Sequence, residues 1–108
     1  MREYELTVLV QPGLDNDGMK AVAEQVGALL TGAGGQVTEI GQLADNTGQI
    51  APAETWRRRR LAYSIDRYRE GYYAVYRVKA PATMMTEVER HLKLNENVLR
   101  YLFIRTDE

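Results

Sequence analysis

The sequence contains no cysteine and only one histidine, His91, among its 108 residues. Without cysteine the chain has no disulfide, no thiol nucleophile and no thiolate ligand for a metal. A zinc site takes three or four protein ligands, most often cysteine and histidine, so a lone histidine argues against one. No apolar run approaches the roughly 18 residues that cross a bilayer. We therefore expect no metal, no cofactor and no membrane partner.

Catalytic groups are equally scarce. His91 has no second histidine, no cysteine and no evident serine nucleophile to pair with it. The glycines within residues 32–35 follow a predicted helix and precede a predicted strand, which reverses the order found in a phosphate-binding loop. No pair of carboxylates stands out as an acid and a base. The sequence therefore predicts a protein that is not an enzyme and has no small-molecule substrate.

The net charge of −1 hides a strong division along the chain. Residues 1–56 carry eight acidic and two basic side chains, whereas residues 57–79 carry two acidic and eight basic ones. Eleven of the 14 basic residues are arginine, which binds phosphate through two donors and stacks on bases better than lysine does. This division predicts one restricted surface that faces an anion.

Hydrophobic patterning predicts strands joined by two helices. The first helix should begin at Asp15 or Asn16 and end at the glycines within residues 32–35. The second helix should follow Pro81. Strands are indicated where apolar and polar residues alternate, over residues 3–10, 36–43, 56–65, 72–80 and 98–106.

The connections complete the predicted fold. Residues 66–71 are interpreted as the turn of a hairpin, and residues 42–55 as a loop outside the core, because turn residues dominate there and periodicity is lost. With residues 36–43 and 56–65 taken as two parts of one strand interrupted by this loop, the resulting β-α-β-β-α-β order predicts one α+β domain over residues 1–108. This is a ferredoxin-like sandwich, with a four-stranded antiparallel sheet and two helices on one face. Its open face should carry Arg77 and Lys79 beside apolar side chains, which is unusual for a surface that meets only water.

The sharpest local feature is the run of four arginines at residues 57–60, where strand alternation places neighbours on opposite faces. One interpretation is contact with several phosphates. The other is a solvated edge strand whose charges prevent aggregation, and spacing alone does not separate the two. Aromatic rings interleaved with arginine are typical of RNA-binding sheets, although packing is the commoner role of each ring singly. The rings are Trp56, Tyr63, Tyr68, Tyr72, Tyr73 and Tyr76.

Three separated segments carry a resemblance to a known family. Residues 1–5 read Met-Arg-Glu-Tyr-Glu, with Pro12 downstream. Residues 58–65 read Arg-Arg-Arg-Leu-Ala-Tyr-Ser-Ile, and residues 95–102 read Asn-Glu-Asn-Val-Leu-Arg-Tyr-Leu. In this order, and together spanning nearly the whole chain, they resemble the bacterial small-subunit ribosomal protein six family.

This resemblance implies a structural, non-catalytic protein of the ribosome with the fold described above. It implies two partners, the central domain of the small-subunit rRNA and ribosomal protein eighteen of the small subunit. The implied location is cytoplasmic, with an organellar ribosome as the alternative. Compared with the family, residues 42–55 resemble an insertion in the second strand. The resemblance implies RNA contacts at Arg2, Tyr4 and Arg100. Roles in binding the partner or lying near RNA are expected for Arg58, Arg59, Arg60, Tyr63, Arg77 and Lys79.

Two other functions stay open on the residues alone. One is a ferredoxin-like domain that binds a small molecule or acts as an enzyme. An acylphosphatase-like site would need an arginine in the loop after the first strand, where residues 11–14 are Gln-Pro-Gly-Leu. The other is a homodimeric interaction module that uses the open face of the sheet.

Overall fold

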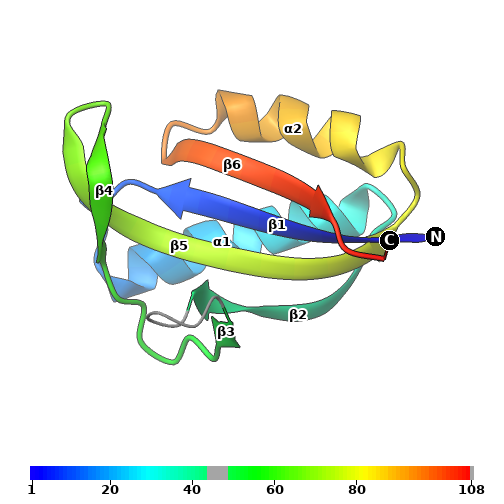
Figure 1. Ribbon diagram of the computed structural model, residues 1–108, viewed down its shortest axis with the longest axis horizontal. Coiled ribbons are helices and arrows are strands. Elements are labelled where there is room, and N and C mark those ends of the chain that lie inside the picture. Colours follow the sequence, from blue (N-terminus) through cyan, green and yellow to red (C-terminus); the bar gives the residue numbers. More distant parts are fainter. Residues whose placement is uncertain (44–48, 108) are drawn as a thin grey trace.

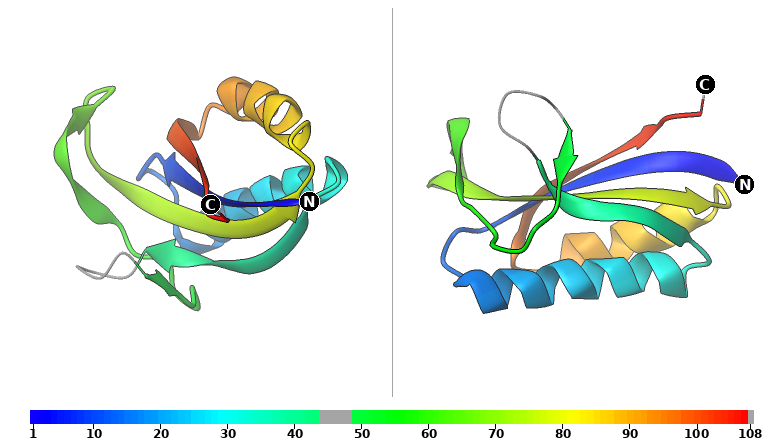
Figure 2. Two further views of the ribbon diagram at one scale, coloured as in Figure 1. Left: turned by 45° about the vertical axis from the view of Figure 1, so that its right-hand side comes forward. Right: turned by 90° about the horizontal axis from the view of Figure 1, so that it is seen from below.

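The computed structural model describes residues 1–43 and 49–107; residues 44–48 and 108 lie outside this description. All strands pair antiparallel, and both helices cover one face of the sheet (Figure 1; Figure 2, right). The predicted α+β sandwich with two helices on one face is therefore confirmed. Its elements, in chain order, are β1 (Arg2–Val10), α1 (Asn16–Gly32), β2 (Gln36–Leu43), β3 (Ile50–Ala51), β4 (Arg59–Ile65), β5 (Tyr68–Ala80), α2 (Met84–Leu94) and β6 (Val98–Arg105).

Within residues 1–43 and 49–107 the sheet contains six strand segments instead of the expected four. Their order is β3-β2-β5-β1-β6, with β4 paired to β5 outside this path. The difference arises because two segments pair with successive parts of the long strand β5. Strand β2 pairs with residues 74–79 and β4 with residues 68–71. The two-residue strand β3 then pairs with the end of β2.

The segment of residues 42–55 departs from the expected loop. It begins within β2 and includes β3, and Ala53 packs against the hydrophobic core, which corrects the expectation that the segment stays outside it. Directly after this segment, Trp56 is 8% exposed, and its backbone N–H donates to Asn16 Oδ1 at 2.6 Å. The returning chain is thus attached to the start of α1. Residues 44–48 of this segment lie outside the described part.

The side chain of Gln42 organises the return of the chain toward β4. Its Nε2 donates to the carbonyl oxygen of Thr55 at 3.0 Å. Its Oε1 accepts a hydrogen bond of 3.1 Å from the N–H of Arg57. The amide of this one side chain therefore supplies hydrogen-bond partners to backbone groups between β3 and β4, where the chain is not paired in the sheet.

The turn between β4 and β5 is shorter than the predicted 66–71. Only Asp66 and Arg67 connect the strands, with φ values of 49° and 73°, and Ile65 pairs directly with Tyr68. Two successive residues with positive φ are the pattern of a type I′ turn, whose twist suits a hairpin. Strand β5 consequently begins at Tyr68 and extends the ribbon beyond the body of the sheet.

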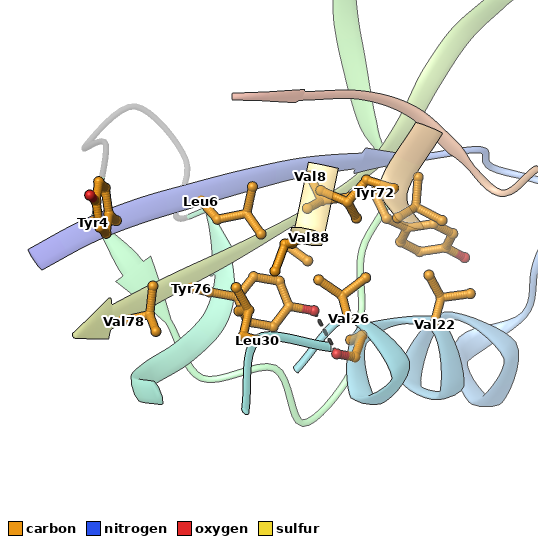
Figure 3. Close-up of a cluster of buried hydrophobic side chains, with 14 of the residues drawn as sticks. Tyr4, Leu6, Val8, Val22, Val26, Leu30, Tyr72, Tyr76, Val78 and Val88 are labelled. Atoms are coloured by element: carbon orange, nitrogen blue, oxygen red, sulfur yellow. Dashed lines mark hydrogen bonds between the residues drawn. The ribbon is translucent and has the colours of Figure 1, made fainter. Parts of the chain in front are cut away.

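The core lies between the sheet and the helices (Figure 3). Strand β1 contributes the alternating residues that the sequence places on one face, and Val26 and Leu30 of α1 meet them. Tyr76 lies among these side chains with no exposed surface, and its hydroxyl donates to the carbonyl oxygen of Ala23 at 2.6 Å. This arrangement leaves the opposite sheet face uncovered by helices, and that face carries the candidate site.

Candidate nucleic-acid interface

One end of the open face carries paired charges. Arg77 Nε lies 3.5 Å from Glu5 Oε2, and its Nη1 lies 3.5 Å from Glu39 Oε1. The neighbouring Lys79 Nζ lies 3.7 Å from Glu3 Oε1. Three carboxylates thus surround the two cations, so this end has no excess of positive charge. Arg77 and Lys79, expected near the partner or RNA, do not form a free basic patch.

The centre of the open face is apolar. Apart from Thr7 of β1, its middle row consists of Leu102 of β6 and Val75 of β5, with Leu9 in the next row toward Arg100 and Ile104 in the next row toward Glu5. Leu9 and Val75 are buried, at 4% and 1% exposure. On the neighbouring strand β6, Leu102 and Ile104 are 57% and 47% exposed. Two exposed branched aliphatic side chains beside a buried apolar pair form a surface suited to contact with another macromolecule.

The other end of the open face places arginines at both sides of an aromatic ring. The strand register sets Arg100 of β6 opposite Leu9, and Leu9 opposite Tyr73 of β5. The guanidinium carbon of Arg59 then lies 6.0 Å from the centre of the Tyr73 ring. Arg59 also donates from Nη1 to the carbonyl oxygen of Leu43 at 3.1 Å. The structure therefore brings Arg59 and Arg100 to the same end of the face.

A charged ribbon extends from this end. We call residues 57–71 the arginine hairpin; they comprise β4, the start of β5 and the residues leading into them, and they stand clear of both helices (Figure 1; Figure 2, left). Two acidic residues, Asp66 and Glu70, lie within it, so its net charge is +4. Its six basic residues are Arg57, Arg58, Arg59, Arg60, Arg67 and Arg69.

The arginines of the predicted run do not all have the same role. Arg58 donates from Nε to the carbonyl oxygen of Pro12 at 2.7 Å and from Nη2 to that of Leu14 at 2.9 Å. Its guanidinium also lies over the Tyr72 ring, 5.4 Å from the centre. The side chain of Arg60 is exposed and makes no hydrogen bond or ion pair to any other described residue. Arg58 therefore fixes the β1–α1 loop, whereas Arg60 is available for a ligand.

A large bulge distorts the hairpin. Residues 61–64 of β4 lie opposite Arg69 alone, between two paired positions. Leu61 turns inward, at 8% exposure, while Tyr63 is 74% exposed. Bulges of this kind redirect side chains and are frequent beside functional sites. The predicted residue Tyr63 is thus presented to solvent among arginines.

Tyr4 is not a surface residue, which corrects its prediction as an RNA contact. It is 3% exposed, and its ring packs edge-on against Phe103, with the ring centres 6.3 Å apart and an angle of 81° between the planes. A ring enclosed in this way offers no face on which a base could stack. Its role is in the core between β1 and β6.

The two other predicted RNA contacts lie at opposite ends of β1. Arg2 is opposite Ala80 at the start of that strand, whereas Arg100 is opposite Leu9 near its end. Seven residues of extended chain separate these positions by about 23 Å. Arg2 and Arg100 are both exposed, but they do not form one cluster.

Arg105 is the basic neighbour of Arg2 that the sequence reasoning missed. Antiparallel pairing of the first and last strands sets Arg105 opposite Tyr4, two residues from Arg2. Its Nε donates to Asp107 Oδ1 at 2.7 Å, and this hydrogen bond lowers the pKa of the Asp107 carboxyl. The pairing of the two terminal strands was the signal that could have revealed it.

Neither metal-binding clusters nor membrane spans are found in residues 1–43 and 49–107. No group of three or more histidine, aspartate or glutamate side chains is arranged there to hold a metal. No helix in this part of the chain is both long and apolar enough to cross a bilayer.

Comparisons with known proteins cover nearly the whole chain. The family model described as Ribosomal protein S6 matches residues 3–105. The small ribosomal subunit protein bS6 of Moorella thermoacetica is 36% identical over 108 residues, covering 100% of this chain and 97% of that protein. The crystal structure of 30S ribosomal protein S6 from Thermotoga maritima shares the fold, with a TM-score of 0.77 at 18% identity, over 97% of this chain and 87% of that one. On the family match and the full-length sequence identity, this chain belongs to the ribosomal protein S6 family.

Proposed function

We propose that this chain binds the central domain of the small-subunit rRNA together with ribosomal protein eighteen of the small subunit. Family membership already gives the coarser function, a structural and non-catalytic component of the small ribosomal subunit. The observation that supports the finer function is the layout of the open face. Its apolar centre lies between a charge-paired end and an arginine-rich end.

The apolar centre and the charge-paired end suit a protein partner. Leu102 and Ile104 expose apolar surface that an RNA backbone would not cover well. The two cations and three carboxylates at the charge-paired end carry a net charge of −1. This negative charge favours a basic partner and disfavours phosphate. A basic protein docked there would also extend the cationic surface offered to RNA.

The arginine-rich end suits RNA. Arg100 and Arg59 lie at either side of Tyr73, and the arginine hairpin continues the positive charge beyond the sheet. The chain as a whole is slightly negative, so a few phosphate contacts at this end would give weak binding. RNA affinity should therefore rise strongly only when the partner is bound.

The decisive experiment measures the affinity of a central-domain rRNA fragment for this chain, for ribosomal protein eighteen, and for the two together. The pair should bind at least about tenfold more tightly than this chain alone. Equal affinity of the isolated chain and the pair would refute the cooperative function. A native mass of two copies in the absence of RNA would instead favour the homodimeric module.

The same substitution at two exposed leucines tests which face of the molecule binds the protein partner. Leu102→Glu places a charge on the open face and should weaken assembly with ribosomal protein eighteen by about tenfold or more. Leu94→Glu makes the same change on α2, where Leu94 is 77% exposed, and should have no effect. If both variants assemble normally, the open face is not the docking surface for the protein partner.

Arg2→Ala and Arg100→Ala should each weaken the RNA complex without loss of folding, because both side chains are exposed at strand ends. Since about 23 Å separates the two positions along β1, their free-energy effects should add. Titrations of the two single variants and the double variant test this. Strong non-additivity would mean that the two arginines bind the same RNA segment.

A further inference from the structure

We propose that the arginine hairpin is an RNA-binding element in its own right. In this proposal Arg60, Arg67 and Arg69 contact the phosphates of an unpaired RNA segment, and Tyr63 stacks on one of its bases. The inference rests on the proposed RNA-binding function. It goes further by assigning the hairpin to RNA instead of the protein partner, and by naming single-stranded RNA as its ligand.

The first argument is the availability of these charges. The side chains of Arg60, Arg67 and Arg69 are exposed and form no hydrogen bond or ion pair with another described residue. In contrast, Arg58 is held by two backbone carbonyls, and Arg77 lies between two carboxylates. Three arginines with unpaired side chains are thus gathered in the hairpin, and its two carboxylates, Asp66 and Glu70, form no ion pair with them.

The second argument is the position of Tyr63. At 74% exposure it is one of the most exposed large side chains of the molecule, and the bulge of residues 61–64 places it between the paired positions of the hairpin. An exposed ring among arginines is the arrangement that binds single-stranded nucleic acid, since stacking tolerates any base while the cations follow the backbone. A duplex offers no unstacked base to such a ring.

The third argument is the shape of the hairpin. Strand β1 pairs with β5 only from Tyr72 onward, whereas β4 pairs with β5 from Tyr68 to Gly71. The hairpin is therefore a two-stranded ribbon outside the main sheet, and Figure 2 shows it standing away from both helices. An RNA strand can lie along this ribbon without contact with the charge-paired end of the open face.

The test uses a 20-nucleotide oligouridylate and the full chain. The affinity of the oligouridylate is measured as a function of salt concentration for three proteins. These are wild type, the double variant Arg60→Gln/Arg69→Gln and the control double variant Lys20→Gln/Arg90→Gln. The control removes the same charge from exposed positions on the two helices. Arg67 is left unchanged because its φ of 73° makes the turn sensitive to substitution. Urea unfolding curves of the two double variants establish that both are folded.

The hairpin variant should reduce the slope of log affinity against log salt by about 1.4, because each single-strand phosphate contact contributes about 0.7. The control should leave the slope unchanged. Equal slopes in both variants would overturn the proposal, since only net charge would matter. The proposal also fails if the hairpin variant binds oligouridylate normally but loses affinity for ribosomal protein eighteen, because the hairpin would then be a protein interface.

Tyr63→Leu tests the stacking separately. It should lower oligouridylate affinity by about tenfold with an unchanged salt slope, because stacking releases no counterions. Unchanged affinity would overturn the role of Tyr63. Failure of wild type and partner to bind the central-domain fragment would refute the proposed function, whereas the oligouridylate measurements would still decide the inference about the hairpin.

Discussion

The buried hydroxyl of Tyr76 allows a prediction whose sign changes with pH. This hydroxyl donates a hydrogen bond of 2.6 Å to the carbonyl oxygen of Ala23, and the ring has no exposed surface. Tyr76→Phe removes this hydrogen bond while keeping the ring. At pH 7 the loss should be about 1 kcal/mol. For a chain of 108 residues this corresponds to a fall in the melting temperature of about 4 °C.

At high pH the advantage of the hydroxyl should disappear. Burial raises the pKa of Tyr76 well above the usual value of 10.0. Between the ordinary and the raised pKa the unfolded chain loses a proton that the folded chain keeps. The stability of the folded state therefore falls by up to about 1.4 kcal/mol per pH unit above pH 10. At pH 11 wild type should consequently be no more stable than Tyr76→Phe.

Urea unfolding of wild type and Tyr76→Phe at pH 7 and pH 11 measures this crossover directly. Tyr63→Phe is the control, because it removes a hydroxyl from a ring that is 74% exposed and should not change stability at pH 7. If the gap between wild type and Tyr76→Phe were the same at both pH values, the hydroxyl would titrate equally in the folded and unfolded chains. The reasoning from burial would then be wrong.

Other predictions concern packing and the arginine run. Val8→Ala and Val26→Ala should each destabilise the fold by about 1–3 kcal/mol, because both lose methyl groups buried between sheet and helix; unchanged urea midpoints would contradict the assigned faces. Arg58→Ala should cost about 1 kcal/mol, since it removes two hydrogen bonds and a cation–π contact at the surface. Arg60→Ala should leave the urea midpoint unchanged, and equal effects of the two would mean that the run acts as one charged strand.

Much of the fold could be predicted because its strands have one buried face. The alternation in β1 and β5 correctly separated the side chains that face the helices from those on the open face. Asp15 was a correct cap of α1, as its Oδ1 accepts from the N–H of Gly18 at 2.7 Å. The resemblance to the ribosomal protein six family is confirmed as well. Local patterns of this kind depend only on neighbours in the sequence.

Tyr4 shows where two predictions conflicted. Alternation placed it in phase with Leu6 and Val8, on the buried face, while the family resemblance suggested an RNA contact. The structure supports the alternation, with Tyr4 3% exposed and packed on Phe103. The periodic pattern was the stronger signal because it reports the position of this side chain in this sheet.

The contacts of the arginines could not be predicted, because they depend on long-range register. Nothing in the sequence distinguishes Arg58 from Arg60, yet only Arg58 reaches the carbonyl oxygens of Pro12 and Leu14. Those partners lie more than 40 residues earlier in the chain. The bulge at residues 61–64 is equally invisible, since it arises from a shift in pairing between two strands.

Register also explains why the charge of a segment is a poor guide to its surface. The sequence separates an acidic first half from a basic stretch over residues 57–79. The sheet brings them together, because Glu3 and Glu5 of β1 lie opposite Lys79 and Arg77 of β5. The far end of β5 has no such acidic neighbours on β1, which pairs with it only from Tyr72 onward. Within the basic stretch the uncompensated charge is therefore concentrated at the hairpin end, and an RNA that approaches the open face should meet this chain there first.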